Sequence, residues 1–452
     1  MYDQDDKTLA SIFKILDRHS VSRETFCTAP WSNLDFDQSG EIHSCYEGKT
    51  KLGNWKTNSV QTEFNTQEYR DLRKWHMEGN KKNTWKNCST CYVHERHNVK
   101  SHRHRNLIDM FDKLGSQGFE DYVKKLKTLN YNCGIDHVFK LEMRGSNYCN
   151  LRCMHCDHVS STSWLNFYTQ QENIDAAREV GVKIHPDVDA NNINDYFKSY
   201  RYTESVDMDS INQVMDACTF ISFSGGEPLI DPQHIKFLQH LTAGKQKVNK
   251  IIEVHTSLNV KNIERYFEYW KKINCIEMMC SLDGPPSTYE YFRRNGNWEL
   301  VKKNIDLITN TFEPNQFFLN CHITFNFFAA LRWREIFEVW TKNNWRLNSN
   351  LVIEGPASAK YLPNDLKLKA INAIRQSIED VEQLSSSDYR HKNDWKFHAT
   401  ECLTFLRNSK TYGDELWYET KDWCKLHDKT SKIQTLDFYP ELEMYYNSSN
   451  EE

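Results

Sequence analysis

Residues 147–156 read Asn-Tyr-Cys-Asn-Leu-Arg-Cys-Met-His-Cys and place Cys149, Cys153 and Cys156 within eight positions, directly after a strand-like run. A C-x3-C-x2-C triplet suits an iron-sulfur cube, because three thiolates hold three irons and leave the fourth iron open to a ligand. A zinc site or a group of buried core thiols is the alternative interpretation. Chance packing rarely collects three cysteines so closely, so the spacing favours chemistry at an open iron.

A second motif lies at the end of the next strand-like run, 219–224, where the chain reads Ser-Gly-Gly-Glu-Pro at 224–228. Glycines lack a Cβ and let the backbone approach a ligand closely, whereas Pro228 fixes the turn that leaves the strand. The carboxylate of Glu227 can accept hydrogen bonds from an ammonium group. Taken alone, this turn is equally typical of an ordinary connection from a strand to a helix.

The two motifs together resemble the radical S-adenosylmethionine (radical SAM) enzymes. The resemblance implies that the three cysteines hold a catalytic [4Fe-4S] cluster, whose open iron binds the amino and carboxylate groups of S-adenosylmethionine (SAM). In that family an electron cleaves SAM to a 5′-deoxyadenosyl radical, which removes a hydrogen atom from the substrate. The residues of the turn that the resemblance assigns to the SAM cofactor are Gly225, Gly226 and Glu227.

Strand and helix patterns alternate after residue 137, in the order of repeated βα units. The strand-like runs are 137–144, 219–224, 250–256, 275–282, 317–326 and 347–354. Amphipathic stretches between them are 234–241, 263–270, 300–308 and 333–340. Such units form a parallel sheet with outer helices that closes into a full or partial barrel, with ligands at the carboxyl ends of the strands. The resemblance sharpens this α/β prediction to a partial (β/α)6 barrel.

The chain of 452 residues is long enough for two or three domains. We expect a small cysteine-rich module over 1–110 and the barrel over 137–356. A polar stretch at about 171–207 resembles an insertion before the second strand of the barrel. Residues 357–452 form a C-terminal extension to which the sequence assigns no role.

Polar side chains follow other strands of the predicted barrel. Ser281 ends the fourth strand, and Arg293 follows in Tyr-Phe-Arg-Arg-Asn-Gly, where its guanidinium could clamp a carboxylate. A helix cap or a surface ion pair explains each residue equally well. Radical SAM proteins carry polar side chains and an arginine here, so the resemblance assigns Ser281 and Arg293 to the cofactor.

A second set of cysteines precedes the barrel: Cys27, Cys45, Cys88 and Cys91. Residues 37–40 read Asp-Gln-Ser-Gly, which predicts a hairpin turn that brings the first two cysteines together. The later C-x2-C knuckle would add two more thiolates to the same metal. Four thiolates suit either Zn²⁺ or a closed [4Fe-4S] cluster.

This pattern, with Leu-Gly-Asn at 52–54, resembles the SPASM auxiliary-cluster module, or its shorter twitch form, of many peptide-modifying radical SAM enzymes. The full module has further cysteines after the knuckle, but His97 and Ser101 occupy their places. We therefore expect one auxiliary [4Fe-4S] cluster instead of two. The module usually follows the barrel, whereas here it comes first.

Composition excludes several classes of protein. A net charge of −5 gives no global attraction to nucleic acid or to an acidic membrane. No apolar run approaches the ~18 residues of a membrane span, and residues 1–20 lack the apolar centre of a signal peptide. Fourteen cysteines in so long a chain fit metal ligation in a reducing cytoplasm better than a disulfide scaffold. The basic segment 94–105 is interpreted as a solvated linker, with an RNA or phosphate contact as the alternative.

We interpret the chain as a cytoplasmic radical SAM enzyme with a catalytic and an auxiliary [4Fe-4S] cluster. The SPASM-like module favours a peptide or protein side chain as substrate, and a donor such as flavodoxin or ferredoxin would supply the electron. One alternative is a radical SAM enzyme that acts on a small molecule or nucleotide. The other is a non-catalytic, metal-stabilised RNA-binding protein, which would bind RNA in a salt-dependent way without cleaving SAM.

Overall fold

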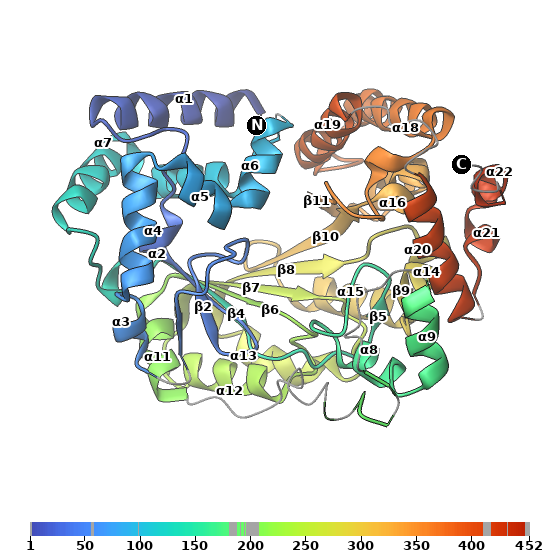
Figure 1. Ribbon diagram of the computed structural model, residues 1–452, viewed down its shortest axis with the longest axis horizontal. Helices are drawn as coiled ribbons and strands as arrows, with labels where there is room; N and C mark the ends of the chain where they lie inside the picture. The colour runs from blue at the N-terminus through green and yellow to red at the C-terminus, as the bar shows by residue number, and fades with distance from the viewer. Residues whose placement is uncertain are drawn as a thin grey trace.

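A mixed sheet of nine strands organises the computed structural model, which describes residues 2–55, 58–97, 99–179, 188–189, 191–193, 195, 208–409, 417–431 and 433–447. The strand order is β11-β10-β8-β7-β6-β4-β1-β2-β3, and helices flank the sheet (Figure 1). The strands are β1 (Asn33–Phe36), β2 (Glu41–His43), β3 (Gly53–Asn54), β4 (Lys140–Arg144), β6 (Phe220–Ser224), β7 (Val248–Thr256), β8 (Ile273–Ser281), β10 (Phe317–Phe325) and β11 (Arg346–Leu351).

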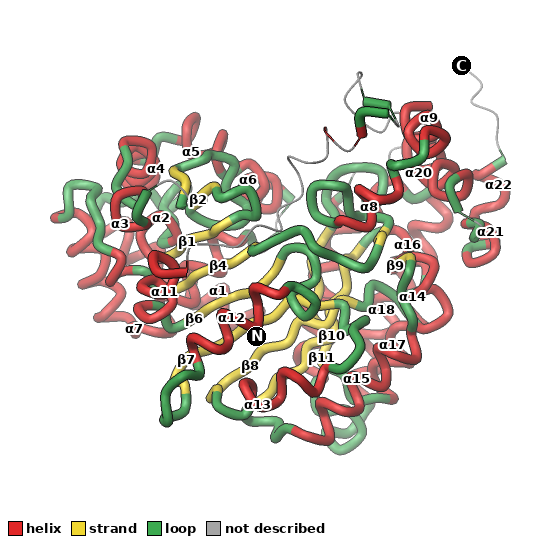
Figure 2. The backbone as a smooth tube through the Cα atoms, turned by 90° about the horizontal axis from the view of Figure 1, so that it is seen from below, coloured by secondary structure: helices red, strands yellow, loops and turns green. Residues whose placement is uncertain are grey.

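The six strands from β4 to β11 are parallel and coincide with the six predicted runs. Apolar positions of these strands, such as Ile221 and Phe223, are buried in the core. Figure 2 shows the strands side by side with helices around the outside. The helices between them include α12 (Pro232–Leu241), the short pair η2 (Ile263–Tyr266) and α13 (Phe267–Trp270), α14 (Pro286–Phe292), α15 (Trp298–Thr311), α16 (Phe327–Leu331) and α17 (Trp333–Lys342). The prediction of a parallel α/β sheet with outer helices is confirmed.

The N-terminal module joins the same sheet. Its strand β1 pairs in parallel with β4, in a register that sets Asn33 opposite Lys140 and Phe36 opposite Met143. Strand β2 returns antiparallel to β1, as the predicted turn at 37–40 requires. The helices of the module are α1 (Tyr2–Arg18), α2 (Ala29–Ser32), α3 (Val60–Glu63), α4 (Gln67–Glu78), α5 (Lys81–Asn87), α6 (Ser89–Arg96) and α7 (His102–Thr128), which kinks at Gly115. The module therefore extends the barrel sheet by three strands, β1, β2 and β3.

A buried ion pair crosses the seam between module and barrel. The guanidinium of Arg144 on β4 donates to both carboxylate oxygens of Asp35 on β1, at 3.2 Å and 2.5 Å. Asp35 is fully buried. Burial raises the pKa of Asp35, and the Arg144 guanidinium opposes that rise. Each charge is therefore tolerated in the seam because the other is present.

The C-terminal extension packs onto the barrel. Its helices are α18 (Asn364–Gln383), α19 (Lys392–Asn408), α20 (Trp417–Lys429), α21 (Thr435–Phe438) and α22 (Glu443–Tyr446). Trp333 of α17 donates to Ser377 of α18 at 2.9 Å, and Ser349 of β11 bonds to His398 of α19 at 3.1 Å. The predicted insertion at 171–207 begins with α9 (Gln171–Glu179), and most of its other residues lie outside the described part of the chain.

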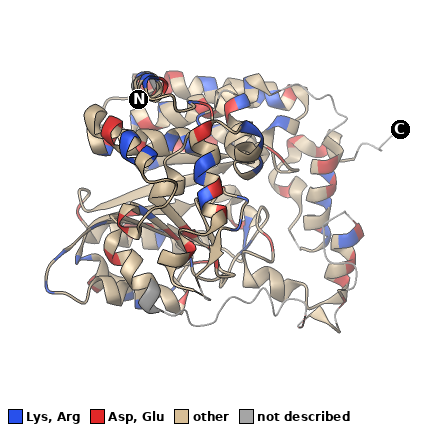
Figure 3. Ribbon diagram, turned by 60° about the vertical axis from the view of Figure 1, so that its left-hand side comes forward, with Lys and Arg blue, Asp and Glu red and all other residues tan. Residues whose placement is uncertain are grey.

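Acidic and basic residues are interspersed along the helices (Figure 3). No described helix combines the length and the apolar character that crossing a membrane demands. Six of the seven cysteines outside the two predicted sets are buried, and only Cys275 is half-buried.

The seam pair gives a stability prediction. Replacing Arg144 with Ala leaves the Asp35 carboxylate buried without a partner, so the free energy of unfolding should fall by about 3–5 kcal/mol. The deficit should shrink as the pH falls, because protonation removes the uncompensated charge. Denaturant unfolding at several pH values measures both effects.

Two variants control this test. Adding Asp35→Asn to Arg144→Ala should recover part of the loss. Arg334→Ala, which removes an exposed ion pair with Asp380, should cost no more than about 1 kcal/mol. Equal losses from Arg144→Ala and Arg334→Ala would show that the seam pair does not anchor the module.

Candidate active site

The loop that carries Cys149, Cys153 and Cys156 follows β4 at the carboxyl end of the sheet. Cys153 belongs to β5 (Arg152–Cys153), which pairs antiparallel with β9 (Arg293–Arg294). The backbone N–H of Cys156 donates to the carbonyl of Cys153 at 3.1 Å. The three predicted cluster ligands are close enough for Cys149 and Cys153 to affect the pKa of Cys156. They lie beside β9, the strand that carries Arg293.

Burial raises the pKa of all three thiols, and the pKa of Cys149 reaches about 12. The neighbouring thiol of Cys153 adds to the rise at Cys149 and Cys156. Arg293 opposes the rise at Cys153, since its guanidinium donates to the sulfur at 3.5 Å. Thiolates at these three positions would need more positive charge than one arginine supplies, and a bound metal cluster would provide it.

The Gly-Gly-Glu turn is in tight contact with the cysteine loop. Gly225 and Gly226 have φ of +75° and +48°, which side chains rarely adopt. A Cβ on Gly226 would lie 2.5 Å from the carbonyl oxygen of Tyr148. The backbone N–H of Glu227 donates to that same oxygen at 2.8 Å. The glycines are thus required by the approach of two backbones, a reason that the sequence alone does not reveal.

The carboxylate of Glu227 is buried and satisfied by protein donors. One oxygen accepts from the hydroxyl of Thr256 at 2.6 Å and from the backbone N–H of Leu229 at 3.2 Å. The other accepts from the backbone N–H and hydroxyl of Ser257, at 2.8 Å and 2.6 Å. A carboxylate has about four acceptor sites, so an ammonium group would have to displace one of these donors. The predicted contact of Glu227 with the cofactor stays a prediction, beside a structural role that ties the turn to β7.

Arg293 and Ser281 lie near the same end of the sheet. The guanidinium of buried Arg293 donates to Asp283 at 2.5 Å as well as to Cys153. Burial alone would raise the pKa of Asp283, but Arg293, His155 and the backbone N–H of Thr324 together outweigh burial and hold the pKa below its usual value. Ser281 is the half-buried last residue of β8. Their predicted contacts with SAM remain predictions, and the observed partners of Arg293 are Asp283 and Cys153.

His155, in the same loop, lies beside the ion pair of Arg293 and Asp283. Its ring stacks on Phe292 at 5.0 Å, and its Nε2 lies 4.0 Å from Asp283. Burial lowers the pKa of His155, so the imidazole is neutral at pH 7.

The four N-terminal cysteines line one small cavity, which we call the auxiliary cage: Cys27, Cys45, Cys88 and Cys91. Burial raises the pKa of every thiol in the cage. His76, Arg103 and Asn106 also line it. The structure thus brings the predicted set together, while the role of each cysteine as a ligand remains a prediction.

Arg103 supplies positive charge beside the cage. It forms a bidentate pair with Glu95 at 2.9 Å and 2.8 Å and is almost fully buried. The interpretation of 94–105 as a solvated linker is therefore wrong at Lys100 and Arg103, which are buried, whereas Arg96 is exposed. The burial of Arg103 is tolerated because Glu95, in the same segment, compensates its charge.

His76 is a cage residue that sequence reasoning missed. Its Nδ1 lies 2.6 Å from the carbonyl of Thr25, which can only accept, so Nδ1 carries the proton. Its Nε2 lone pair therefore faces the sulfur of Cys88 at 3.7 Å. No sequence pattern links His76 to the cysteines, because helix α4 brings it there.

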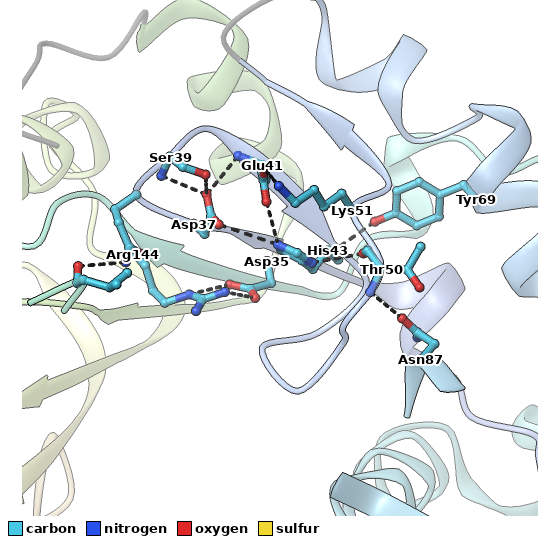
Figure 4. Close-up of polar contacts among 12 residues, drawn as sticks. Asp35, Asp37, Ser39, Glu41, His43, Thr50, Lys51, Tyr69, Asn87 and Arg144 are labelled. Carbon is cyan, nitrogen blue, oxygen red and sulfur yellow. Dashed lines mark hydrogen bonds and ion pairs between the residues drawn. The ribbon is translucent and has the colours of Figure 1, made fainter. Parts of the chain in front are cut away.

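Hydrogen bonds order the hairpin that precedes Cys45 (Figure 4). Asp37 accepts from the backbone N–H and hydroxyl of Ser39 at 2.9 Å and 2.7 Å, and from the backbone N–H of Glu41 at 2.9 Å. His43 bonds to the carbonyl of Thr50 at 3.0 Å. Burial would raise the pKa of Asp37, but bonds from His43 and Ser39 lower it to about 2.

This network reaches the cage through Asn87. The side-chain oxygen of Asn87 accepts from the backbone N–H of Thr50 at 2.8 Å, and its amide donates to the sulfur of Cys88 at 3.4 Å. The hairpin and the knuckle are thus held in one arrangement around the thiols.

The spacing of the thiols bears on the metal. Zn–S bonds of about 2.3 Å place the sulfurs of a zinc tetrahedron about 3.8 Å apart. Among the described residues, which include all fourteen cysteines, no three sulfurs lie mutually within 4.8 Å. Any three sulfurs of either set therefore include a pair that lies farther apart than in a zinc tetrahedron.

Comparison with known families gives two matches. Residues 143–326 match the radical SAM superfamily, and residues 27–92 match SPASM, described as an iron-sulfur cluster-binding domain. The chain thus carries a radical SAM domain preceded by a SPASM domain. The predicted family and the prediction of iron-sulfur clusters are confirmed.

Similar solved structures include anSMEcpe with bound AdoMet, at 15% identity and a TM-score of 0.34, over 54% of this chain and 61% of that chain. Another is Streptococcus suis SuiB bound to precursor peptide SuiA, at 14% identity and a TM-score of 0.32, over 67% of this chain and 61% of that chain. The present chain spans about three fifths of the length of both structures. A search of curated proteins finds no match.

The contact at Gly226 gives a second prediction. Gly226→Ala should push the cysteine loop off the turn, lower the free energy of unfolding by about 2 kcal/mol or more, and reduce the iron retained after reconstitution. Denaturant unfolding and iron analysis measure the two effects. Gly244→Ala is the matched control, because no atom lies within 4 Å of the added Cβ. Identical behaviour of the two variants would contradict the assigned contact.

Proposed function

We propose that the protein is a radical SAM enzyme that removes a hydrogen atom from a peptide or protein side chain. The contact between the cysteine loop and the Gly-Gly-Glu turn carries this proposal. Two motifs far apart in sequence share the carbonyl oxygen of Tyr148, which accepts from Glu227 and excludes any side chain at Gly226. This contact puts the predicted cluster ligands and the predicted SAM site at adjacent strand ends.

The residues of the chain would position and shield the reactants. Cys149, Cys153 and Cys156 would hold the catalytic cluster, and Arg293 would stabilise the thiolate of Cys153. When bound, the cluster supplies the electron that breaks the C5′–S bond of SAM, giving methionine and a 5′-deoxyadenosyl radical that takes a hydrogen atom from the substrate. We propose flavodoxin or ferredoxin as the donor that replaces the electron.

The SPASM domain supports a peptide or protein substrate, because it resembles the auxiliary-cluster modules of peptide-modifying radical SAM enzymes. A small molecule or nucleotide is the second candidate within the family. The RNA-binding alternative rests on the basic segment 94–105, whose Arg103 is committed to Glu95.

The third prediction tests catalysis. Replacing Cys149, Cys153 and Cys156 together with Ala should abolish release of 5′-deoxyadenosine from SAM under anaerobic reduction, because no other group can bind SAM and deliver the electron. Cys275→Ala removes a half-buried thiol from β8 and should leave release unchanged. Normal release from the triple variant would refute the assignment.

The fourth prediction concerns the auxiliary cage. Anaerobically reconstituted protein should hold about eight irons, four in each of two cubes. Replacing Cys27, Cys45, Cys88 and Cys91 with Ala should bring the count to about four, while cleavage of SAM persists and turnover of the substrate falls much further. About four irons and one zinc per wild-type chain would instead make the cage a structural zinc site.

A further inference from the structure

A cavity of about 220 Å³ lies between the SPASM side of the molecule and the C-terminal extension. Its walls come from the loop after β2, the start of α7, the end of β11 and helix α19. Most of these walls lie outside residues 27–92 and 143–326, which the two families cover. The cavity holds about seven water molecules at roughly 30 Å³ each, which is room for one side chain.

Glu401 of α19 is a buried, incompletely paired carboxylate in this wall. The residue is 2% exposed, and its Oε1 has no hydrogen-bond partner in the described part of the chain. Its Oε2 lies 3.7 Å from the guanidinium of Arg105 and 3.8 Å from His398. Burial lowers the pKa of His398 to about 3, so His398 adds no positive charge. A buried acceptor without a donor is costly unless a ligand supplies one.

The charges around the cavity favour a cation. Lys100 also lines it, but its ammonium lies 3.4 Å from Asp5 and 3.3 Å from Asp6. Arg105 pairs with Oε2 of Glu401, and Glu47 is a second lining carboxylate. Burial raises the pKa of Glu401, and Arg105 and Lys100 oppose that rise only in part, so a further cation would stabilise the carboxylate. Oε1 of Glu401 is the acceptor at which that cation would bind.

We propose that this cavity, the Glu401 pocket, binds the ammonium or guanidinium group of a basic side chain of the substrate. The inference rests on the proposed function, because it assumes a peptide or protein substrate. The C-terminal extension would then contribute to substrate selectivity through Glu401 of α19. Glu401 is a binding residue in this account, and it takes no part in the cleavage of SAM.

The test is calorimetric titration of the reconstituted full-length protein, under anaerobic conditions, with Nα-acetyl-lysine amide. Nα-acetyl-norleucine amide is the neutral probe of similar shape. The lysine probe should bind and the norleucine probe should not. Glu401→Gln keeps the size of the side chain but removes its charge, and should weaken binding of the lysine probe roughly tenfold or more.

Arg105→Gln should act in the opposite direction, since it removes the cation that competes for Glu401. Tighter binding in that variant cannot arise from misfolding. Glu382→Gln, on the exposed surface of α18, should leave the affinity unchanged. Equal binding of the two probes, absence of binding by the lysine probe, or unchanged affinity in Glu401→Gln would each overturn the inference.

Release of 5′-deoxyadenosine, measured on the same preparations, separates this inference from the proposed function. Release without selective binding of the lysine probe would defeat the Glu401 pocket alone. Selective binding without release would defeat the proposed catalysis and leave the pocket as a binding site.

Discussion

The parallel pairing of β1 with β4 is the contact on which the arrangement of both cysteine sets depends. Strand β4 leads directly into the catalytic cysteine loop, whereas β1 lies between Cys27 and Cys45. One ladder of backbone hydrogen bonds therefore fixes the auxiliary cage relative to the barrel. The module comes first in the chain, yet it lies at the edge of the sheet where the barrel begins. Its position in the sequence does not separate it from the barrel.

Each cysteine set has an arginine held in place by a carboxylate. Arg293 donates to Cys153 while Asp283 fixes its other end, and Arg103 lines the auxiliary cage while Glu95 binds it bidentately. A buried arginine without such a partner would itself be costly. The pairs therefore supply positive charge near buried sulfurs without leaving a free cation in the core. This arrangement favours thiolates, the form in which cysteine binds iron.

The local parts of this structure could be predicted from the sequence, and the contacts between distant segments could not. The six barrel strands follow from runs of apolar residues, and the turn at 37–40 follows from its residue types. The pairing of Asp35 with Arg144 joins residues 109 positions apart, and no short-range pattern encodes it. Glu227 is instructive, because its motif is evident in the sequence whereas its four protein donors are not. Likewise, the charge of segment 94–105 is evident, but its burial depends on Glu95 and on tertiary packing.

The start of helix α7 lies between the auxiliary cage and the Glu401 pocket, and its residues line both. Arg103 and Asn106, three residues apart, lie on one side of the helix and line the auxiliary cage. Arg105 lines the Glu401 pocket, and His102 lines both cavities. A side chain held in the pocket would therefore sit within one helical turn of the cage. In the proposed account, α7 would therefore set the separation between a side chain in the Glu401 pocket and the four cysteines of the cage.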